Sequence, residues 1–284
     1  MGELARRTGF AVVAIPAAGF LIWQGGIAFA LTLSVCAAIA AWEFFRLAGH
    51  DGVRAFAVGG VPLAALIPII VHTNMVGITL VPVGAAGALA VLAIFATAVW
   101  RRTNERPLSA VAATVFGVVY TGGLLSFGYA LRYHRFVVDA AGGTALVGLP
   151  LVVTWATDTG AYAVGKAIGR RKLMPAVSPG KTVAGAIGGL VVAVVAASLY
   201  VPYVLRTWGH LSLTPAGIVL FGAIVSVTAQ VGDLAESLLK REAGVKDTSK
   251  IIPGHGGVLD RLDSLLFVLP VSYVLLTEML VVAP

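Results

Sequence analysis

The sequence predicts an all-α, polytopic integral membrane protein with about nine transmembrane helices. Hydrophobic residues make up 58% of its 284 positions, and only 12% are charged. Its mean hydropathy is +0.94. Such a chain cannot cover its apolar surface with polar side chains, so lipid must surround most of it. The 34 glycines fit this prediction, because small residues let membrane helices approach each other closely.

The positions of the cysteine, of the basic residues and of the first apolar run exclude several other kinds of protein. Cys36 is the one cysteine and lies in an apolar run, which excludes a disulfide framework and a thiolate metal site. The formal charge of +7 does not indicate a nucleic-acid binder, because the basic residues lie in short gaps between apolar runs. Met1 to Arg7 resembles the start of a signal peptide, but hydrophobicity resumes after residues 24–26. We therefore expect a retained first span.

The apolar runs can be placed in order, since a transmembrane helix needs about 20 mostly apolar residues. The expected spans are residues 8–23, 26–45, 55–72, 76–100, 109–130, 144–165, 183–204, 213–235 and 263–282. The longest polar connections are 166–182 and 236–262. We therefore divide the chain into about five N-terminal spans (1–143) and a C-terminal region (144–284) that carries both polar loops and would be the catalytic part.

The distribution of basic residues predicts the orientation. With nine spans, the N-terminus and the connections after even-numbered spans lie on one side of the membrane. That side holds all but three of the 20 Lys and Arg residues, the exceptions being Arg132, Arg135 and Arg206. By the positive-inside rule this side is cytoplasmic. The N-terminus and both long polar loops are therefore expected to face the cytoplasm.

Charged residues in the first half of the chain suggest structural roles. Glu43 and Arg46 are three residues apart near the end of the second span, a spacing at which they could pair along a helix. A structural or headgroup-anchoring role is the better interpretation of this pair.

The polar stretch at residues 158–185 offers two chemical features. Asp158 lies inside an expected span, where a carboxylate is costly and usually faces a cavity or a partner. The alternative is a buried acid tied to Lys166 or to a hydroxyl. The turn from Ser178 to Thr182 combines two hydroxyls, a glycine and Lys181 at the start of a span. These are the ingredients of a phosphate-binding turn at a helix N-terminus, although the spacing is not that of a Walker motif.

The densest polar stretch reads SLLKREAGVKDTSKIIPGHGGVLDRLD, from Ser237 to Asp263. Six of the 13 acidic residues lie between positions 233 and 263. Three glycines among residues 253–257 permit left-handed dihedrals and close backbone approach, which a merely solvated loop between helices does not need. We therefore interpret this stretch as the functional centre of the chain.

Carboxylates on either side of this stretch predict a cation site. Residues that are three, four and seven positions apart lie on one face of a helix. Four polar residues have this spacing, namely Asp233, Glu236, Ser237 and Lys240. Asp260 and Asp263 are likewise three apart. Two carboxylate pairs at the ends of neighbouring helices could converge on a divalent ion, and all-oxygen ligation favours Mg²⁺.

The same stretch resembles the signature of the phosphatidate cytidylyltransferase (CDP-diacylglycerol synthase) family. That pattern is S-x-hydrophobic-K-R-x4-K-D, then P-x-H-G-G-hydrophobic-x-D-R-hydrophobic-D. The positions that match it are Ser237, Lys240, Arg241, Lys246, Asp247, Pro253, His255, Gly256, Gly257, Asp260, Arg261 and Asp263. The resemblance covers residues 150–284 well, and the first half only by hydropathy and Glu43 to Leu47. Gly180 and Ala184 depart from the lysine and glutamate that are common in the family's serine-proline turn.

The resemblance implies an enzyme that converts CTP and phosphatidate into CDP-diacylglycerol and pyrophosphate. It implies Asp233 and Asp260 as metal ligands supported by Glu236 and Asp263, and it assigns neutralisation of the triphosphate to Lys240, Arg241, Lys246 and Arg261. The lipid headgroup would lie against Asp158, Ser178 and Lys181. Further substrate contacts would come from Ser237, Asp247, His255, Gly256 and Gly257, with a structural role for His255 equally open.

The implied setting is the inner cell membrane, with the site facing the cytoplasm and a homodimer as the assembly. Mg²⁺ is the expected cofactor, and a second, monovalent cation such as K⁺ is left open. One alternative is a related CTP-dependent lipid kinase, or a CDP-lipid synthase with another lipid acceptor. A second alternative is a secondary transporter, suggested by Asp158 within a span. The clustering of charges at one membrane edge and the absence of a sequence repeat favour the enzyme.

Overall fold

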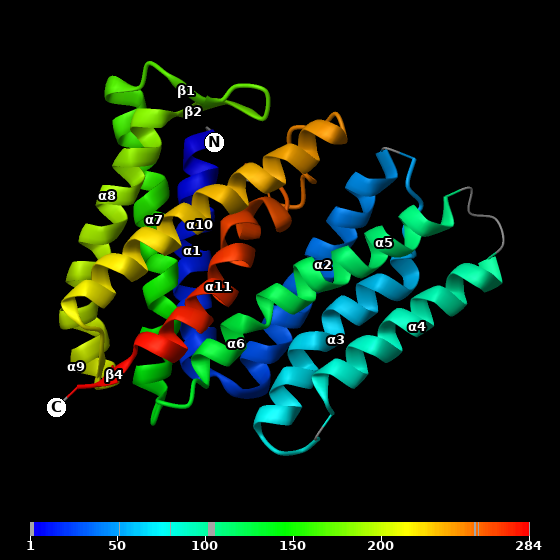
Figure 1. Cartoon of the computed structure of the whole chain (residues 1–284), viewed down its shortest axis with the longest axis horizontal. Helices are drawn as coiled ribbons and strands as arrows, with labels where there is room; N and C mark the ends of the chain where they lie inside the picture. The colour runs from blue at the N-terminus through cyan, green and yellow to red at the C-terminus, as the bar shows by residue number, and fades with distance from the viewer. Residues whose placement is uncertain are drawn as a thin grey trace. The chain divides into compact units, whose positions relative to one another are not determined.

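The computed structural model describes residues 3–50, 52–79, 81–101, 106–252, 254 and 256–283. It confirms an all-α polytopic membrane protein (Figure 1). Within the described residues, eight helices are long and apolar enough to cross a membrane. The first expected span lies in α1 (Glu3–Gln24), whose apolar part, Val12–Gln24, is shorter than the others.

Each of the other expected spans also falls on a helix. The helices of the first half are α2 (Gly26–His50), α3 (Ala57–Met75), α4 (Val83–Arg101), α5 (Pro107–Val118), the π-helix η1 (Val119–Gly123) and α6 (Phe127–Arg132). Those of the second half are α7 (Ala140–Ile168), α8 (Val183–Tyr200), the π-helix η2 (Val201–Leu205), α9 (Arg206–Gly209), α10 (Pro215–Glu242) and α11 (Leu259–Met279).

The chain forms two compact units, and α10 and α11 each contribute to both. Unit 1 comprises Met1–Tyr129 and Leu239–Leu262, and unit 2 comprises Ala130–Leu238 and Asp263–Pro284. The polar connection predicted at 236–262 is shorter than expected, because α10 continues to Glu242 and α11 begins at Leu259. Asp260 therefore belongs to α11, as does Asp263, which was expected to begin the ninth span.

In unit 1, α2 packs along α3 and also contacts α5 (Figure 1). Aromatic rings fill part of this interface. Phe44 and Phe45 of α2 lie edge to face with ring centroids 5.8 Å apart, and Phe44 also contacts Phe116 and Tyr120. Such ring pairs bury large apolar areas with preferred geometries, so they fix α2, which carries Glu43, against its neighbours.

In unit 2, α7 and α8 pack along each other (Figure 1). Glycine is required at this interface. A Cβ on Gly160 would lie 2.7 Å from the Cβ of Val192, and one on Gly188 would lie 2.5 Å from the Cβ of Val164. Helix association in lipid depends on such close backbone approach. The pair forms one wall of the cavity described below.

Short strands, which the sequence did not indicate, occupy two places in unit 2. The expected 166–182 loop contains an antiparallel hairpin of β1 (Lys172–Met174) and β2 (Ser178–Thr182), which lies at the end of α7 and α8 (Figure 1). β3 (Leu211–Ser212) pairs with β4 (Val281–Val282). Thr182 then caps α8, since its hydroxyl accepts the Gly185 N–H at 3.1 Å. The start of a span directly after Thr182 is thus confirmed.

Candidate active site

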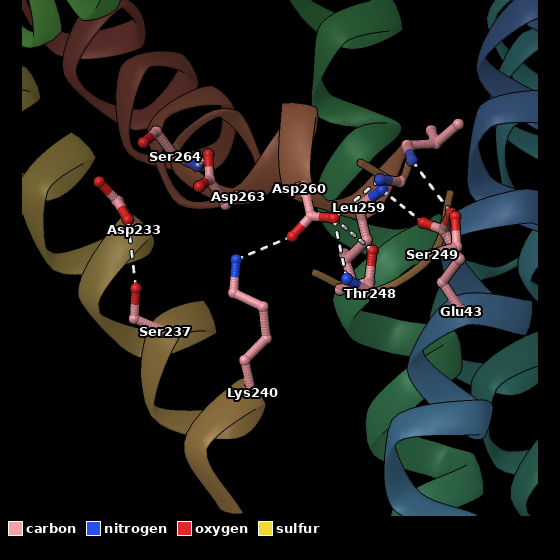
Figure 2. Close-up of polar contacts among 12 residues, drawn as sticks. Glu43, Asp233, Ser237, Lys240, Thr248, Ser249, Leu259, Asp260, Asp263 and Ser264 are labelled. Atoms are coloured by element: carbon pink, nitrogen blue, oxygen red, sulfur yellow. Dashed lines mark hydrogen bonds and ion pairs between the residues drawn. The ribbon is translucent and has the colours of Figure 1, made fainter. Parts of the chain in front are cut away.

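In unit 1, a buried carboxylate organises the loop between α10 and α11. Asp260 is 6% exposed. Its Oδ2 accepts the backbone N–H of Thr248 at 2.9 Å, the Thr248 hydroxyl at 2.8 Å and the Gly257 N–H at 2.8 Å. Its Oδ1 accepts from Nζ of Lys240 at 2.8 Å (Figure 2). Asp260 thereby joins the end of α10, the middle of the loop and the start of α11.

A second buried carboxylate holds the same loop from the side of α2. Glu43 is fully buried, and it accepts the Ser249 hydroxyl at 2.5 Å. It also accepts the Val258 N–H at 3.1 Å and the Leu259 N–H at 2.6 Å (Figure 2). The first N–H groups of a helix have no partner within it and carry partial positive charge. Glu43 therefore caps α11 across more than 200 residues of sequence.

This arrangement corrects the expected pairing of Glu43 with Arg46. Both Glu43 oxygens bind the loop and the start of α11, while the Arg46 guanidinium carbon lies 4.7 Å from the ring centroid of Trp42. The helical spacing allowed the ion pair. Long-range packing of α2 against the loop offered stronger partners, because unpaired buried N–H groups are costly.

The glycine turn has the left-handed dihedrals and the close backbone contacts that the sequence suggested. Gly254 and Gly256 have φ values of 78° and 81°, which favour glycine. The turn is closed by the Ile252 N–H, which donates to the Gly256 carbonyl at 2.9 Å. The Gly257 N–H binds Asp260, so it is not available to a phosphate oxygen in this arrangement.

Gly257→Ala should lower the free energy of unfolding by about 1–3 kcal/mol, the usual cost of overpacking. A Cβ at this position would clash with the Thr248 hydroxyl and with Oε1 of Glu43. Thermal unfolding in detergent measures the effect. Gly180→Ala is the matched control, because a Cβ there meets nothing within 4 Å. Equal melting of the two variants would contradict the close packing of this turn.

The other predicted residues of unit 1 lie close to Asp260 in the sequence. The structure leaves exposed Arg241, Lys246, Asp247 and Arg261. Pro253 and His255 lie outside the described residues. The loop thus presents basic side chains to solvent while its backbone is held by Glu43 and Asp260. That combination is suited to binding an anion on a preorganised segment.

Unit 2 contains a cavity of about 510 Å³ formed by α7, the β1–β2 hairpin, α8 and α10. Small residues and a few polar side chains line it, among them Asp158, Lys166, Lys172, Lys181, Gln230 and Asp233. Nζ of Lys181 lies 2.6 Å from Oδ2 of Asp233. The Ser237 hydroxyl is 3.4 Å from Oδ1 of Asp233 (Figure 2), which is long for such a bond.

The structure therefore brings together three of the unit 2 residues predicted from sequence. Asp158 and Lys181 line the cavity together with Asp233, whereas Ser178 is half-buried in β2 and is not a lining residue. Glu236 is fully buried. Oδ1 of Asp263 accepts the N–H of its neighbour Ser264 at 2.6 Å.

The predicted convergence of carboxylates on a cation is not preformed. Among the described residues, no three or more His, Cys, Asp or Glu side chains gather in a way that could hold a metal ion. Asp260 has protein donors on both oxygens, so it has little capacity left for a cation here. Asp233 lines the cavity of unit 2, where its oxygens lie 2.6 Å from Nζ of Lys181 and 3.4 Å from the Ser237 hydroxyl. A cation bound by Asp233 would therefore have to displace Lys181.

Three residues at these sites were missed by reasoning from sequence, and Glu43 was assigned only a structural or headgroup-anchoring role. Glu43 carried a usable signal, since an acid inside an apolar run usually has a buried partner or a function. Thr248 and Ser249 carried none, because small polar residues are common in loops. Gln230 is a polar residue inside an expected span, which was a usable signal. Their roles follow only from the contacts to Asp260 and Glu43 and from the cavity lining.

Comparisons with known proteins identify the family of the chain. Residues 5–279 match the family described as "Cytidylyltransferase family". A protein of Staphylococcus epidermidis named phosphatidate cytidylyltransferase is 30% identical over 272 residues, which is 96% of this chain and 98% of that protein. Proteins of the same name from Staphylococcus haemolyticus and Bacillus subtilis are 42% and 47% identical over 157 and 134 residues.

The latter two matches span 58% and 48% of those relatives' own lengths. The family match extends over nearly the whole chain and includes both units. The chain therefore belongs to the cytidylyltransferase family.

Proposed function

We propose that this protein transfers the cytidylyl group of CTP to phosphatidate, yielding CDP-diacylglycerol and pyrophosphate. The observation that carries the proposal is the loop between α10 and α11, which is fixed by Asp260 and Glu43 and presents Lys246 to solvent, with the exposed Arg261 next to it in the first turn of α11. The names of the similar proteins support the same reaction. A membrane setting suits an enzyme with a lipid substrate and a lipid product.

The chemistry makes modest demands on the protein. A phosphate oxygen of phosphatidate forms a bond to the α-phosphorus of CTP, and the bond from that phosphorus to the bridging oxygen of the β-phosphate breaks. The bonding electrons leave with pyrophosphate. Because the attacking oxygen is already anionic, no strong base is required. Catalysis then consists mainly of positioning two polyanions and stabilising charge on the phosphates.

In unit 1, the basic residues of the loop would neutralise the triphosphate. Lys246 of the loop is exposed, as are Arg241 in the last turn of α10 and Arg261 in the first turn of α11, which supports this role. Lys240 is held by Asp260 at 2.8 Å and is only 14% exposed, so we assign it a positioning role on the loop. The other proposed contacts of this unit are the exposed Asp247 and the glycine turn apart from the Gly257 N–H, which Asp260 already binds; His255 is proposed either as a contact or as a structural residue of the turn.

In unit 2, the cavity would receive the lipid headgroup. Lys166 and Lys181 supply positive charge among its lining residues, and small residues of α7 and α8 supply apolar walls. An anionic headgroup that carries two acyl chains needs this combination of charge and apolar surface. The phosphate group of a bound lipid would compete with Asp233 for the Lys181 ammonium group.

Mg²⁺ is proposed as the cofactor. When bound, it would neutralise charge on the phosphates. Mg²⁺ is commonly held by one or two carboxylates together with substrate phosphates and water, and not by a complete protein cage. Asp233, at the cavity, is the residue proposed to bind it. The metal roles of Asp260, Glu236 and Asp263, and a monovalent cation such as K⁺, remain predictions.

Asp233→Asn should raise the Mg²⁺ concentration required for half-maximal activity by roughly tenfold or more, since the loss of one anionic oxygen weakens a hard-cation site. A titration of initial rate against Mg²⁺ with purified protein measures it. Asp139→Asn is the control, because Asp139 caps α7 through the Gly142 N–H and Asn caps as well as Asp. An unchanged Mg²⁺ dependence in Asp233→Asn would remove Asp233 from the metal site.

We also propose that the loop and the cavity face the cytoplasm of the inner cell membrane, where CTP is found. The asymmetric distribution of basic residues supports this orientation. Labelling a cysteine introduced at Lys250 with an impermeant reagent, in vesicles of known orientation, tests it. The homodimer implied by the family resemblance remains a prediction, which the particle mass in detergent relative to the 29.2 kDa chain would measure.

The reaction itself is tested with purified protein in detergent, phosphatidate, labelled CTP and Mg²⁺. Formation of CDP-diacylglycerol and pyrophosphate in equal amounts supports the proposal. Release of CDP instead of pyrophosphate would indicate a lipid kinase. Failure to form any product across phosphatidates of several chain lengths would contradict the proposed reaction and favour a test of transport.

A further inference from the structure

A second cavity, of about 540 Å³, lies in unit 1 beside the loop. Its volume falls within the range of small-molecule sites, about 300–1,000 Å³. One wall is the last turn of α2, with Arg46, Leu47 and His50, and the other is residues 245–250 of the loop. The sequence suggested only a structural or headgroup-anchoring role for Arg46 and indicated no role for His50.

The cavity is lined mainly by positive charge. Arg46, Lys246 and Lys250 are cationic, Asp247 is the one acidic lining residue, and the ring of His50 lines the same cavity. Within the described residues, neither lysine nor the Arg46 guanidinium forms an ion pair. Three cations that face one cavity repel one another, so an anion bound there would be stabilised by all of them.

The side chains from α2 are already oriented. The Arg46 guanidinium stacks over Trp42 at 4.7 Å, and Nδ1 of His50 lies 2.8 Å from the Arg46 carbonyl oxygen. A planar guanidinium held in this way can bind two phosphate oxygens at once. Basic residues at a helix C-terminus also complement the helix dipole. That role explains Arg46 and His50 but not the two lysines that face them from the loop.

The opposite wall of the cavity, formed by loop residues 245–250, is held in place by hydrogen bonds to Asp260 and Glu43. Thr248 and Ser249, which lie between Lys246 and Lys250, are the residues bound by Asp260 and Glu43. The basic residues of the loop therefore flank its two anchored positions. A bound anion would meet a segment whose backbone is already ordered, which reduces the entropy lost on binding.

We propose that this cavity binds a phosphate-bearing anion, and that Arg46 and His50 of α2 bind it together with Lys246 and Lys250. The inference deepens the proposed function and rests on it, since CTP and phosphatidate both carry phosphate groups. The triphosphate of the nucleotide and the headgroup of the lipid share this chemistry, and the experiment below separates them.

The test is calorimetric titration of the full-length protein in detergent with pyrophosphate as the probe. Arg46→Gln should weaken pyrophosphate binding roughly tenfold to a hundredfold, the usual effect of losing a hydrogen bond to a charged group. Arg46→Lys keeps the charge but not the two-pronged geometry, so it should retain part of the affinity. Arg171→Gln is the matched control, because Arg171 is exposed and lines neither cavity; its affinity should equal that of the wild type.

The same variants identify the source of the phosphate. If the cavity holds the triphosphate, Arg46→Gln raises KM for CTP and leaves KM for phosphatidate unchanged; if it holds the lipid headgroup, the reverse is found. Arg46→Gln that binds pyrophosphate as tightly as the wild type, or an equal loss in Arg171→Gln, overturns the inference.

The two proposals fail in different ways. If the wild-type protein forms no CDP-diacylglycerol, the proposed reaction is contradicted. If Arg46→Gln nevertheless lowers the affinity for pyrophosphate and Arg171→Gln does not, the anion site is still supported. His50→Gln provides a second variant judged by the same affinity criterion if Arg46→Gln does not fold, which its melting curve would reveal.

Discussion

Asp260→Asn is expected to lower kcat/KM for cytidylyl transfer by more than about a hundredfold. Removing one partner of a buried ion pair usually lowers folding stability by about 3–5 kcal/mol, so the loop should lose its order. A hundredfold lower rate requires that about 2.7 kcal/mol of transition-state stabilisation is lost with it. Asn keeps the shape of Asp260 but replaces one accepting oxygen by a donor. Lys240 or the Thr248 and Gly257 N–H groups would then lose their partner.

Initial rates with varied CTP, measured together with the melting temperature in detergent, test this prediction. Because Asp260 orders the loop, the activity loss should accompany a lower melting temperature. Asp139→Asn again provides the control for the same chemical change, with neither quantity altered. An Asp260→Asn protein of wild-type activity would show that the loop functions without this carboxylate.

Glu43→Ala is expected to lower the free energy of unfolding by about 3–5 kcal/mol, because it leaves three buried donors without their acceptor. These donors are the Ser249 hydroxyl and the N–H groups of Val258 and Leu259. Glu43→Gln, which retains one accepting oxygen, should lie between the wild type and Glu43→Ala. Loop residues 243–258 should become sensitive to proteolysis in the same order.

Denaturation in detergent and limited proteolysis measure these effects. Glu278→Ala is the matched control, since Glu278 is exposed on α11, and it should melt as the wild type does. A Glu43→Ala protein with wild-type stability and an intact loop would contradict the capping role assigned to Glu43.

Much of the fold was predictable from the sequence because the requirements of a bilayer are local. A spanning segment must be apolar over about 20 residues and must satisfy its own backbone hydrogen bonds. All nine expected spans accordingly fall on helices, with the first in α1. Errors arose at polar boundaries. The hairpin of β1 and β2 and the extension of α10 to Glu242 carry no hydropathy signal.

The candidate site was only partly predictable. The signature stretch identified Lys240, Asp260 and the glycine turn by type and spacing, and the structure places them together in unit 1. It did not predict that the Gly257 N–H and both oxygens of Asp260 would be used to order the loop. Spacing reports which residues share a helix face. It does not report which donors a buried carboxylate will meet.

By itself, then, the sequence determined the helical membrane architecture, the position of the polar stretch and the kind of chemistry its residues can perform. Tertiary structure alone decided the partner of Glu43. Its helical neighbour Arg46 was available, but packing of α2 against the loop brought it three donors from more than 200 residues away. A buried carboxylate binds the donors that would otherwise be left unpaired, and the whole fold determines which donors those are.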